Sequence, residues 1–429
     1  MCSMSIAMPM TQPSARQEFA PNGRHCVSVS GLCLYNMMVA LQVAGEFSIS
    51  SAWYAAWRLW GQILGDCATN IPPSLAWYEA RELVLRYGWN TMAYQILNPG
   101  ITLWFSHDRH AVVGYVLAGG YRVVAGAPIS AEDDLVATVA QFESAANADR
   151  QRVCYFGAQN RIAAIVAATG RASQLLLGAQ PIWDPNHWPA IIARKASLRA
   201  QIARARNKGI RVMEWPSDTA TNHPELRQCL AEWLATRGLP SLHFLVEPET
   251  LARLQDRRVF VALRDRRVAG FLIATPIPQR NGWLIEQIVR GANAPNGLAE
   301  LLVDNAMQNL AADGSTYITL GLAPLSRHAD GAESTHPLWV QAVLHWMRVH
   351  GQRFYNFDGL DSFKAKLQPD SWEPVYALTR ERWVGARALY AITGAFGGES
   401  PIVFLCRALL RAASQEWYWF RQRTQGVGT

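Results

Sequence analysis

The sequence contains very little lysine, and its cysteines follow no recognisable pattern. Only four of the 40 basic residues are lysine, so arginine carries almost all of the positive charge. The seven cysteines are scattered, odd in number and never spaced as metal ligands are. This argues against a zinc site and a disulfide framework and favours reduced thiols. A phosphate-binding P-loop and a nucleophile triad are also absent from the sequence, which predicts no metal site.

Long apolar runs are scarce as well. The first residues resemble no cleavable signal peptide, and residues 1–26 are polar enough to predict a disordered lead. Residues 27–45 hold no charge, but they include four polar side chains and are barely long enough to span a bilayer. We expect a buried helix there, with a membrane span as the alternative. The predicted location is cytoplasmic, with peripheral contact at the inner membrane left open.

Length and charge set broader bounds. A chain of 429 residues is long enough for two or three domains with well-buried cores. The net charge of +7 favours anionic partners, such as tRNA, acidic lipid or a phosphorylated cofactor.

An internal repeat organises the middle of the chain. Residues 102–118 align without gaps with residues 258–274, and both read as strand, charged turn, strand. In each copy a glycine–aromatic pair (Gly120-Tyr121 and Gly282-Trp283) opens the next strand. The repeat predicts two copies of one domain that contains a βαβ unit.

The second copy is the more informative. Its apolar run from Trp283 to Val289 predicts a buried strand, followed by a helix over residues 298–310 and a strand over residues 317–322. A loop that enters a helix presents free N–H groups that suit a phosphate. Glu286 and Arg290 are charged residues in and just after the strand, and such residues need partners or a function.

The most basic segment covers residues 193–212 and contains no acid. At helical spacing Lys195, Arg199 and Arg206 share one side, whereas Leu198 and Ile202 pack inward. By charge pattern alone, a solvated face and an RNA contact remain equally open. Near the end, residues 401–423 predict a helix rich in aromatics and arginine, which suits either a membrane interface or a cap on the domain.

Several motifs together carry a family resemblance. APNG (294–297), ELL (300–302), LGLAPLS (320–326), FDGLDSFKAKLQP (357–369) and WEPVYAL (372–378) occur in order. Over about residues 85–380 the chain resembles the C-terminal catalytic domain of bacterial phosphatidylglycerol lysyltransferases. That family moves an amino acid from aminoacyl-tRNA onto a lipid with tandem acetyltransferase-like (GNAT) folds. Its members usually carry a multi-span membrane module upstream, for which this sequence shows no counterpart.

The resemblance implies an α/β fold of tandem GNAT-like domains with mixed central sheets and helical extensions at both ends. The expected division is a lead (1–26), a helical extension (27–84), a degenerate first domain that ends in the basic helix (85–225), a catalytic second domain (226–385) and a C-terminal helical extension (386–429). Neither copy shows the glycine pattern by which GNAT enzymes hold the pyrophosphate of coenzyme A, so this donor is disfavoured.

The resemblance also implies a site without a cofactor, because the tRNA ester is already activated. The implied catalytic residues are Glu286, Arg290, Lys366, Lys364 and Asp358. Asp361 is a further candidate for the base, and an ordinary ion pair is the alternative for each acid. The implied substrate-binding residues are Asn296, Gly297, Gly321 and Ser326, with Lys195, Arg199 and Arg206 on the tRNA.

The expected partners are therefore aminoacyl-tRNA and either an anionic phospholipid or a small soluble amine or alcohol. An N-acyltransferase that uses acyl-CoA or an acyl carrier is the second class. A non-catalytic RNA- or membrane-binding protein is the third.

Overall fold

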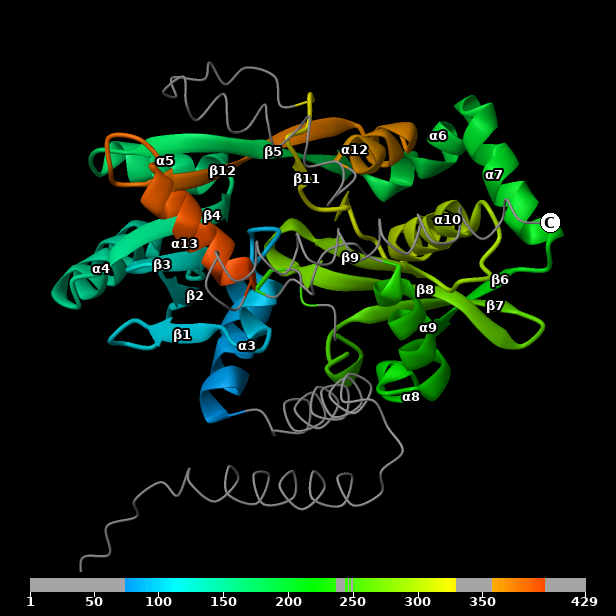
Figure 1. Ribbon diagram of the computed structural model, residues 1–429, viewed down its shortest axis with the longest axis horizontal. Coiled ribbons are helices and arrows are strands. Elements are labelled where there is room, and N and C mark those ends of the chain that lie inside the picture. The colour runs from blue at the N-terminus through cyan, green and yellow to red at the C-terminus, as the bar shows by residue number, and fades with distance from the viewer. Residues whose placement is uncertain (1–73, 237–243, 246, 248–249, 329–356, 398–429) are drawn as a thin grey trace, which may run out of the picture. The chain divides into compact units, whose positions relative to one another are not determined.

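The computed structural model describes residues 74–236, 244–245, 247, 250–328 and 357–397 (Figure 1). The chain divides into two compact units between Pro72 and Pro73, and all described residues belong to the second. The predicted lead, residues 27–73 of the N-terminal extension, and residues 398–429 lie outside the described residues. In the part of the chain that is described, every helix is too short or too polar to cross a bilayer.

The first repeat forms the predicted strand–turn–strand unit. β1 (Thr102–Phe105) and β2 (Val112–Ala118) are antiparallel, and β3 (Tyr121–Ala125) follows β2. Along β2 the side chains alternate between two apolar clusters, as the twofold period of a strand requires. Helix α4 (Leu135–Ala148) then returns the chain to β4 (Arg152–Ala158), which runs parallel to β3.

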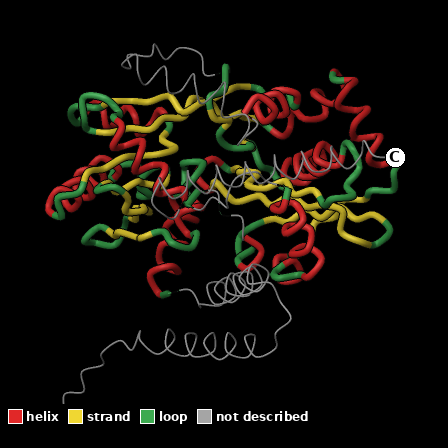
Figure 2. The backbone as a smooth tube through the Cα atoms, in the orientation of Figure 1, coloured by secondary structure: helices red, strands yellow, loops and turns green. Residues whose placement is uncertain are grey.

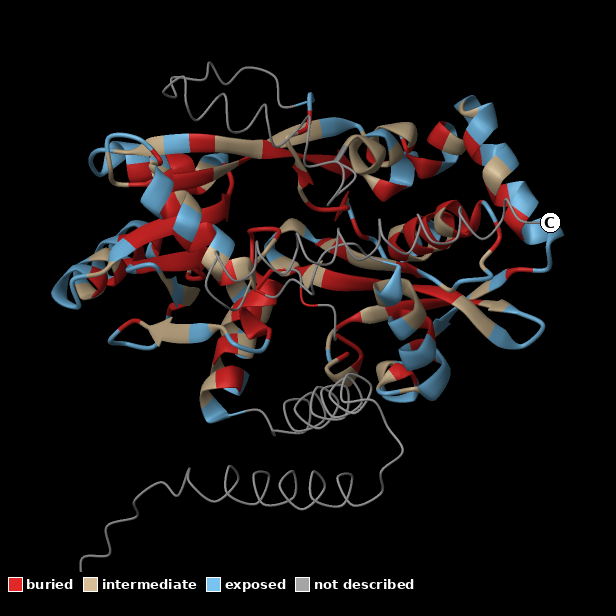
Figure 3. Ribbon diagram, in the orientation of Figure 1, coloured by how far each residue is buried: buried red, intermediate tan, exposed pale blue. Residues whose placement is uncertain are grey.

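The second repeat has the same order. β7 (Arg258–Arg264), β8 (Arg267–Ile277) and β9 (Gly282–Arg290) form the antiparallel part, and α10 (Leu298–Ala312) leads to β10 (Tyr317–Thr319), parallel to β9. One apolar face of α10 is buried, and it contains Leu301, Leu302, Ala306 and Leu310 (Figure 3). β6 (Arg211–Trp215) pairs with β7 at the edge.

Two strands join the halves into one sheet. β5 (Ser173–Trp183) lies between β12 (Ser371–Thr379) and β10, while β12 lies between β4 and β5. β12, which comes late in the chain, therefore completes the sheet of the first half. β5, which comes before the second repeat, completes the sheet of the second half. The result is one mixed, 12-stranded sheet (Figure 2). A separate boundary at residues 225 and 226 remains a prediction.

Helices cover both faces of each half. One face of the first half is covered by α3 (Leu75–Tyr87), α13 (Ala386–Gly397) and the 3-10 turn η1 (Tyr94–Leu97), and the other by α4 and α5 (Asn160–Ala168). One face of the second half is covered by α10, α6 (Trp188–Arg194), α7 (Ala196–Asn207) and α12 (Phe357–Lys366), and the other by α8 (Ser217–Ala220) and α9 (Pro224–Ala235). The described residues also form the short 3-10 turns η2 (Pro185–His187), η3 (Thr250–Ala252) and η4 (Pro278–Arg280).

Two predicted elements need correction. The strand expected over residues 317–322 ends at Thr319, because the chain turns out of the sheet through Gly321, whose φ is 68°. It rejoins the sheet as β11 (Ala323–Pro324), which pairs with β5. The basic segment is not one helix: it breaks at Lys195, between α6 and α7, and α7 ends at Asn207 before β6 begins.

The contact between β11 and β5 requires a glycine at position 178. Gly178 has φ +148°, and a Cβ there would lie 2.1 Å from the carbonyl oxygen of Ala323.

We expect Gly178→Ala to lower the free energy of unfolding by about 3 kcal/mol, from backbone strain and overpacking. Gly209→Ala is the control, since Gly209 also has a positive φ (+79°) but open space around it. Gly209→Ala should lower the free energy of unfolding by about 1 kcal/mol. Equal decreases for the two variants in thermal unfolding would contradict the steric explanation.

Candidate active site at the open edge of β9

The sheet opens along β9. β10 pairs with β9 only at Gly282, Trp283 and Leu284, whereas β8 pairs with β9 as far as Arg290. Beyond Leu284, the edge of β9 that faces away from β8 therefore has no strand partner among the described residues. In the first half, the equivalent strand β3 pairs with β4 along its whole length, so that half has no such opening.

A β-bulge lies at the start of this open stretch. Ile273 pairs with Gln287 and Ala274 pairs with Ile285, so Glu286 is the extra residue between them. Ile285 and Ile288 pack beneath α10, whereas Glu286 and Gln287 both contact residues on the other face. Bulges re-aim side chains and are frequent beside active sites. Here the bulge places two consecutive polar side chains on one face.

Arg257 is a member of the site that the sequence did not reveal. It is buried, and its Nε donates to Oε2 of Glu286 at 3.1 Å. Its other nitrogens donate to the carbonyl of Arg253 at 2.6 Å and to Oδ1 of Asn98 at 3.5 Å, and the guanidinium lies over the ring of Tyr94. Burial opposes the charged form, but the interactions with Glu286, Tyr94 and Asp256 together outweigh it and raise the pKa of Arg257. The pair fixes Glu286 in position.

Lys364 holds open the loop that leaves β10. Its Nζ donates to the carbonyl oxygens of Leu320, Gly321 and Leu322 at 2.8, 2.8 and 2.9 Å. These carbonyls lie where the chain departs from the sheet and so lack strand partners. Burial lowers the pKa of Lys364 to about 7, while three carbonyl dipoles favour the ammonium form, whose three N–H groups match them in number.

With this geometry established, similarity to known proteins decides the family. A model of the C-terminal part of phosphatidylglycerol lysyltransferase matches residues 81–379, which include both repeats and the shared strands. The chain belongs to this family. The resemblance inferred from the motifs is thereby confirmed, and so is the α/β tandem GNAT-like fold.

The relatives are distant and considerably longer. A phosphatidylglycerol lysyltransferase of Bacillus subtilis is 22% identical over 297 residues, which are 68% of this chain and 34% of the relative. A bifunctional lysylphosphatidylglycerol biosynthesis protein of Gordonia bronchialis is 23% identical over 310 residues, or 68% of this chain and 26% of that protein. The chain thus spans about a third or less of the length of these relatives.

Solved structures support the fold. A C-terminal domain assigned to a lysylphosphatidylglycerol synthetase from Agrobacterium fabrum superimposes with a TM-score of 0.65 at 24% identity, covering 75% of this chain and 97% of that one. The L-PGS structure from Bacillus licheniformis gives 0.62 at 22% identity, with 78% and 96% covered.

The predicted catalytic residues of this lysyltransferase-family chain do not all come together. Glu286 is buried at the bulge, whereas Arg290 is exposed at the end of β9. Because Ile288 packs toward α10 and Val289 packs toward α9, strand alternation turns Arg290 to the α10 side, away from Glu286. Lys366 lies in α12 and pairs with Glu300 in the first turn of α10 at 2.7 Å. Their roles in catalysis stay predictions.

The other residues of α12 and its neighbouring loop form a second polar group. Asp358 lies in the first turn of α12. Ser326 donates to Asp361 and accepts the N–H of His328 at 3.2 Å. The ring of His328 stacks on Trp372 at 4.4 Å. This arrangement orders the chain after β11, and the sequence alone did not predict it.

Two predicted substrate-binding residues differ in their surroundings. Gly297 caps α10 with φ 91°, and a Cβ there would lie 2.0 Å from the carbonyl oxygen of Gln201 in α7. The glycine is therefore explained by the close packing of α10 on α7. Asn296 beside it is exposed. Substrate binding by either residue remains a prediction.

The predicted tRNA-binding residues are partly engaged within the protein. Arg199 donates to the carbonyls of Ile192 and Ala193 at the end of α6. Arg206 pairs at 2.7 Å with Asp304, a buried residue of α10. Lys195 is half-buried at the junction of α6 and α7. The first two therefore stabilise the packing of α6, α7 and α10.

A polar network around Glu373 was also missed, although this residue belongs to the WEPVYAL motif. Its carboxylate accepts from Gln159 at 2.7 Å, Gln180 at 3.0 Å and Arg280 at 2.9 Å. The phenol of Tyr317 donates to it at 3.4 Å. These residues come from four separate parts of the chain, so their meeting follows only from the strand exchange.

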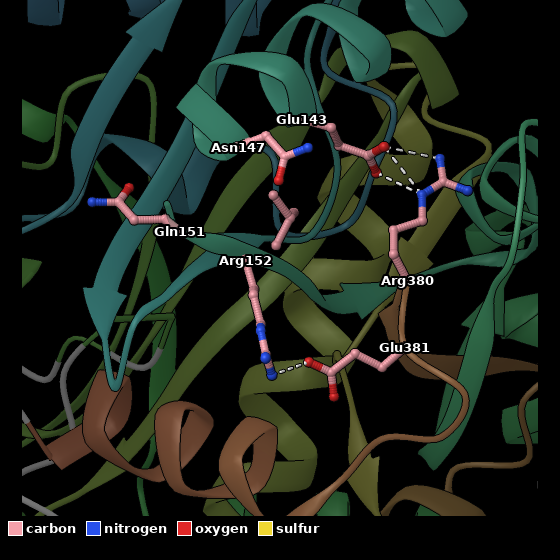
Figure 4. Close-up of a pocket in the computed structure, with 7 residues that line it drawn as sticks. Glu143, Asn147, Gln151, Arg152, Arg380 and Glu381 are labelled. Carbon is pink, nitrogen blue, oxygen red and sulfur yellow. Dashed lines mark hydrogen bonds and ion pairs between the residues drawn. The ribbon is translucent and has the colours of Figure 1, made fainter. Parts of the chain in front are cut away.

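A surface pocket lies elsewhere, in the first half. Its charged residues already pair with one another: Arg380 with Glu143 at 3.0 Å, and Arg152 with Glu381 at 2.7 Å (Figure 4). None of the predicted site residues lines it. We assign it no role in the reaction.

Lys364 offers a direct test of how the opening is held. Lys364→Met should leave three carbonyls without their donor and lower the free energy of unfolding by about 3 kcal/mol. Lys208→Met, at an exposed position of the same residue type, is the control and should change it by less than ~0.5 kcal/mol. Thermal unfolding of the two variants measures this. Similar midpoints would show that Lys364 does not clamp the loop.

Proposed function

We propose that this chain transfers an amino acid from aminoacyl-tRNA to phosphatidylglycerol. The observation that carries the proposal is the open edge of β9, which occurs in the half that holds the family motifs and not in the other. The names of the Bacillus subtilis and Gordonia bronchialis relatives supply the lipid product. The tRNA donor is the part of the proposal that rests on the family alone.

The reaction exchanges one ester for another. A hydroxyl oxygen of the lipid headgroup attacks the ester carbonyl carbon of the donor, and the bond from that carbon to the ribose oxygen of tRNA breaks. The hydroxyl proton ends on the released ribose oxygen. Such a step needs placement of the two substrates and donors for the oxyanion. Backbone N–H groups on the open edge of β9 are suited to be those donors.

The remaining site features support positioning. Arg257 and the bulge hold Glu286 at the edge, and Lys364 holds the loop opposite. Since the strand β10 stops at Thr319, a substrate has room to approach the backbone of β9 where a neighbouring strand would otherwise pair. We propose Glu286 as a member of the reaction centre.

A transfer assay tests this function. The full chain is incubated with total charged tRNA, phosphatidylglycerol vesicles and a polar extract, and radiolabelled amino acid is followed into organic and aqueous products. We expect label in the lipid fraction, and ribonuclease treatment of the donor should abolish it. Label in the aqueous fraction would favour a soluble acceptor. Transfer from acyl-CoA without tRNA would overturn the proposal.

For tRNA itself, the structure directs attention to the outer side of the basic segment. Arg194, Arg204, Lys208 and Arg211 are exposed, and none forms an ion pair within the described part of the chain. Exposed positive charges without an acid partner suit a phosphate backbone. We propose these residues as the tRNA contact, together with Lys195, and we propose that residues 401–423 make any bilayer contact.

Charge reversal distinguishes the exposed basic residues from the arginine that is paired within the protein. Arg204→Glu and Lys208→Glu should raise the KM for charged tRNA several-fold, flatten its salt dependence and leave thermal stability near wild type. Arg206→Glu should instead lower thermal stability, because it places a second acid beside the buried Asp304. An unchanged KM in the first two variants, measured over a range of salt, would place the tRNA elsewhere.

A further inference from the structure

We infer that Glu286 and Gln95 bind the α-ammonium group of the aminoacyl donor, through side-chain oxygens that have no partner within the described chain. This inference rests on the proposed function and adds the part of the donor that these residues recognise. It assigns a substrate-binding role to Gln95, which no motif indicated.

The first oxygen belongs to Glu286. Only 5% of its side chain is exposed, and Oε2 is engaged by Arg257. Oε1 is buried and has no hydrogen-bond partner among the described residues. An unsatisfied buried carboxylate oxygen is costly, and such groups in folded proteins call for a ligand or another explanation. This oxygen lies at the bulge, beside the open edge of β9.

The second oxygen belongs to Gln95 in η1. This side chain is fully buried, and Nε2 donates to Oγ1 of Thr275 at 3.3 Å, while Oε1 has no partner in the described part of the chain. Thr275 pairs with Leu284, two residues before Glu286. Asn98, three residues after Gln95, contacts Arg257, the partner of Glu286. The segment from η1 to Asn98 therefore brings both unpaired oxygens to the same face of β8 and β9.

The chemistry of the missing ligand follows from these two groups. Both oxygens are hydrogen-bond acceptors. Nε of Arg257 and Nε2 of Gln95 already donate to other atoms, so the ligand must supply the donors. The proton of an acceptor hydroxyl would satisfy only one of the two. An ammonium group has three N–H donors and a positive charge, and bonds from such a group to a carboxylate are the stronger kind. Arg257 lies at Oε2, which leaves Oε1 to the ammonium group.

The α-ammonium group of an aminoacyl ester is adjacent to the carbonyl that reacts. Binding it at Glu286 would hold that carbonyl against the edge of β9, where backbone N–H groups can stabilise the oxyanion. Recognition of this group would also make the site disfavour an ester without nitrogen, because a buried acceptor left unpaired is heavily penalised.

The test changes one atom of the donor. tRNA is charged with the amino acid that the transfer assay selects, or with its 2-hydroxy counterpart, and kcat/KM is measured for the full chain. We expect wild type to prefer the aminoacyl donor by at least about 30-fold. Glu286→Gln and Gln95→Leu should each lower kcat/KM for the aminoacyl donor by about 10- to 100-fold more than kcat/KM for the hydroxyacyl donor. Gln95→Glu keeps an acceptor oxygen and should restore the preference.

Glu381→Gln is the matched control, since Glu381 pairs with Arg152 in the first half, far along the sheet from β9. It should alter neither reaction. If Glu286→Gln lowers both reactions by the same factor, Glu286 acts on the acceptor or only on the fold, and the inference is wrong. A wild type that does not distinguish the two donors would overturn it as well. If lysine is the donor, norleucine as a third arm separates the α-ammonium from the side-chain ammonium.

A binding measurement keeps the inference separate from the proposed function. Adenosine carrying the aminoacyl group through a 3′-amide cannot transfer it, so its binding to the full chain needs no activity. We expect it to bind more tightly than the 2-hydroxy analogue, and Glu286→Gln to remove that difference. If wild type transfers nothing but shows this preference, the proposed function fails and the ammonium site stands. If the two analogues bind equally, the ammonium site fails whatever the transfer assay shows.

Discussion

The separation of β9 from β10 after three residue pairs is the constraint on which the rest of the site depends. It leaves backbone N–H and C=O groups without strand partners, which folded proteins normally avoid. On one side, Lys364 takes up three carbonyls of the departing loop, and β11 returns the chain to the sheet against β5. On the other side the edge of β9 stays open. A stable fold can contain such an opening because the carbonyl groups on the side of the loop have hydrogen-bond donors within the protein. The backbone groups on the edge of β9 are then available to a substrate.

The two halves share one fold but differ in how their central strands pair. In the first half β3 and β4 pair without a gap, and the charged residues near them form ordinary ion pairs. In the second half a bulge places Glu286 and Gln287 together, and Arg257 is buried beside them. The exchange of β5 and β12 makes the first half part of the support for the second, since β5 is the strand against which β10 pairs. The first half is therefore a structural requirement of the candidate site.

Basic residues of the segment 193–212 differ in their contacts although they carry the same charge. Arg199 caps the end of α6 and Arg206 neutralises a buried aspartate, so both stabilise the helices that cover α10. Arg204 in α7 and Lys208 directly after it are exposed. A helical projection places side chains on a face, but it says nothing about acids that other helices bring to that face. Asp304 is 98 residues away from Arg206 in the sequence.

The sequence by itself determined the repeated elements and their order. Local periodicity, turn residues and the gapless repeat were enough to predict the paired hairpins, the helix after Gly297 and the tandem fold, because these depend on neighbours within a few residues. Motif order was enough for the family. Only the tertiary structure decided that β12 crosses into the first half and that Glu286 is a bulge residue. It alone brought Arg257 and Gln95 to β8 and β9 and placed Glu373 at the centre of a polar network. The bulge and the place of β12 depend on register between strands, and contacts such as Gln95 with Thr275 and Arg257 with Asn98 join segments more than a hundred residues apart. A linear pattern carries no information on either.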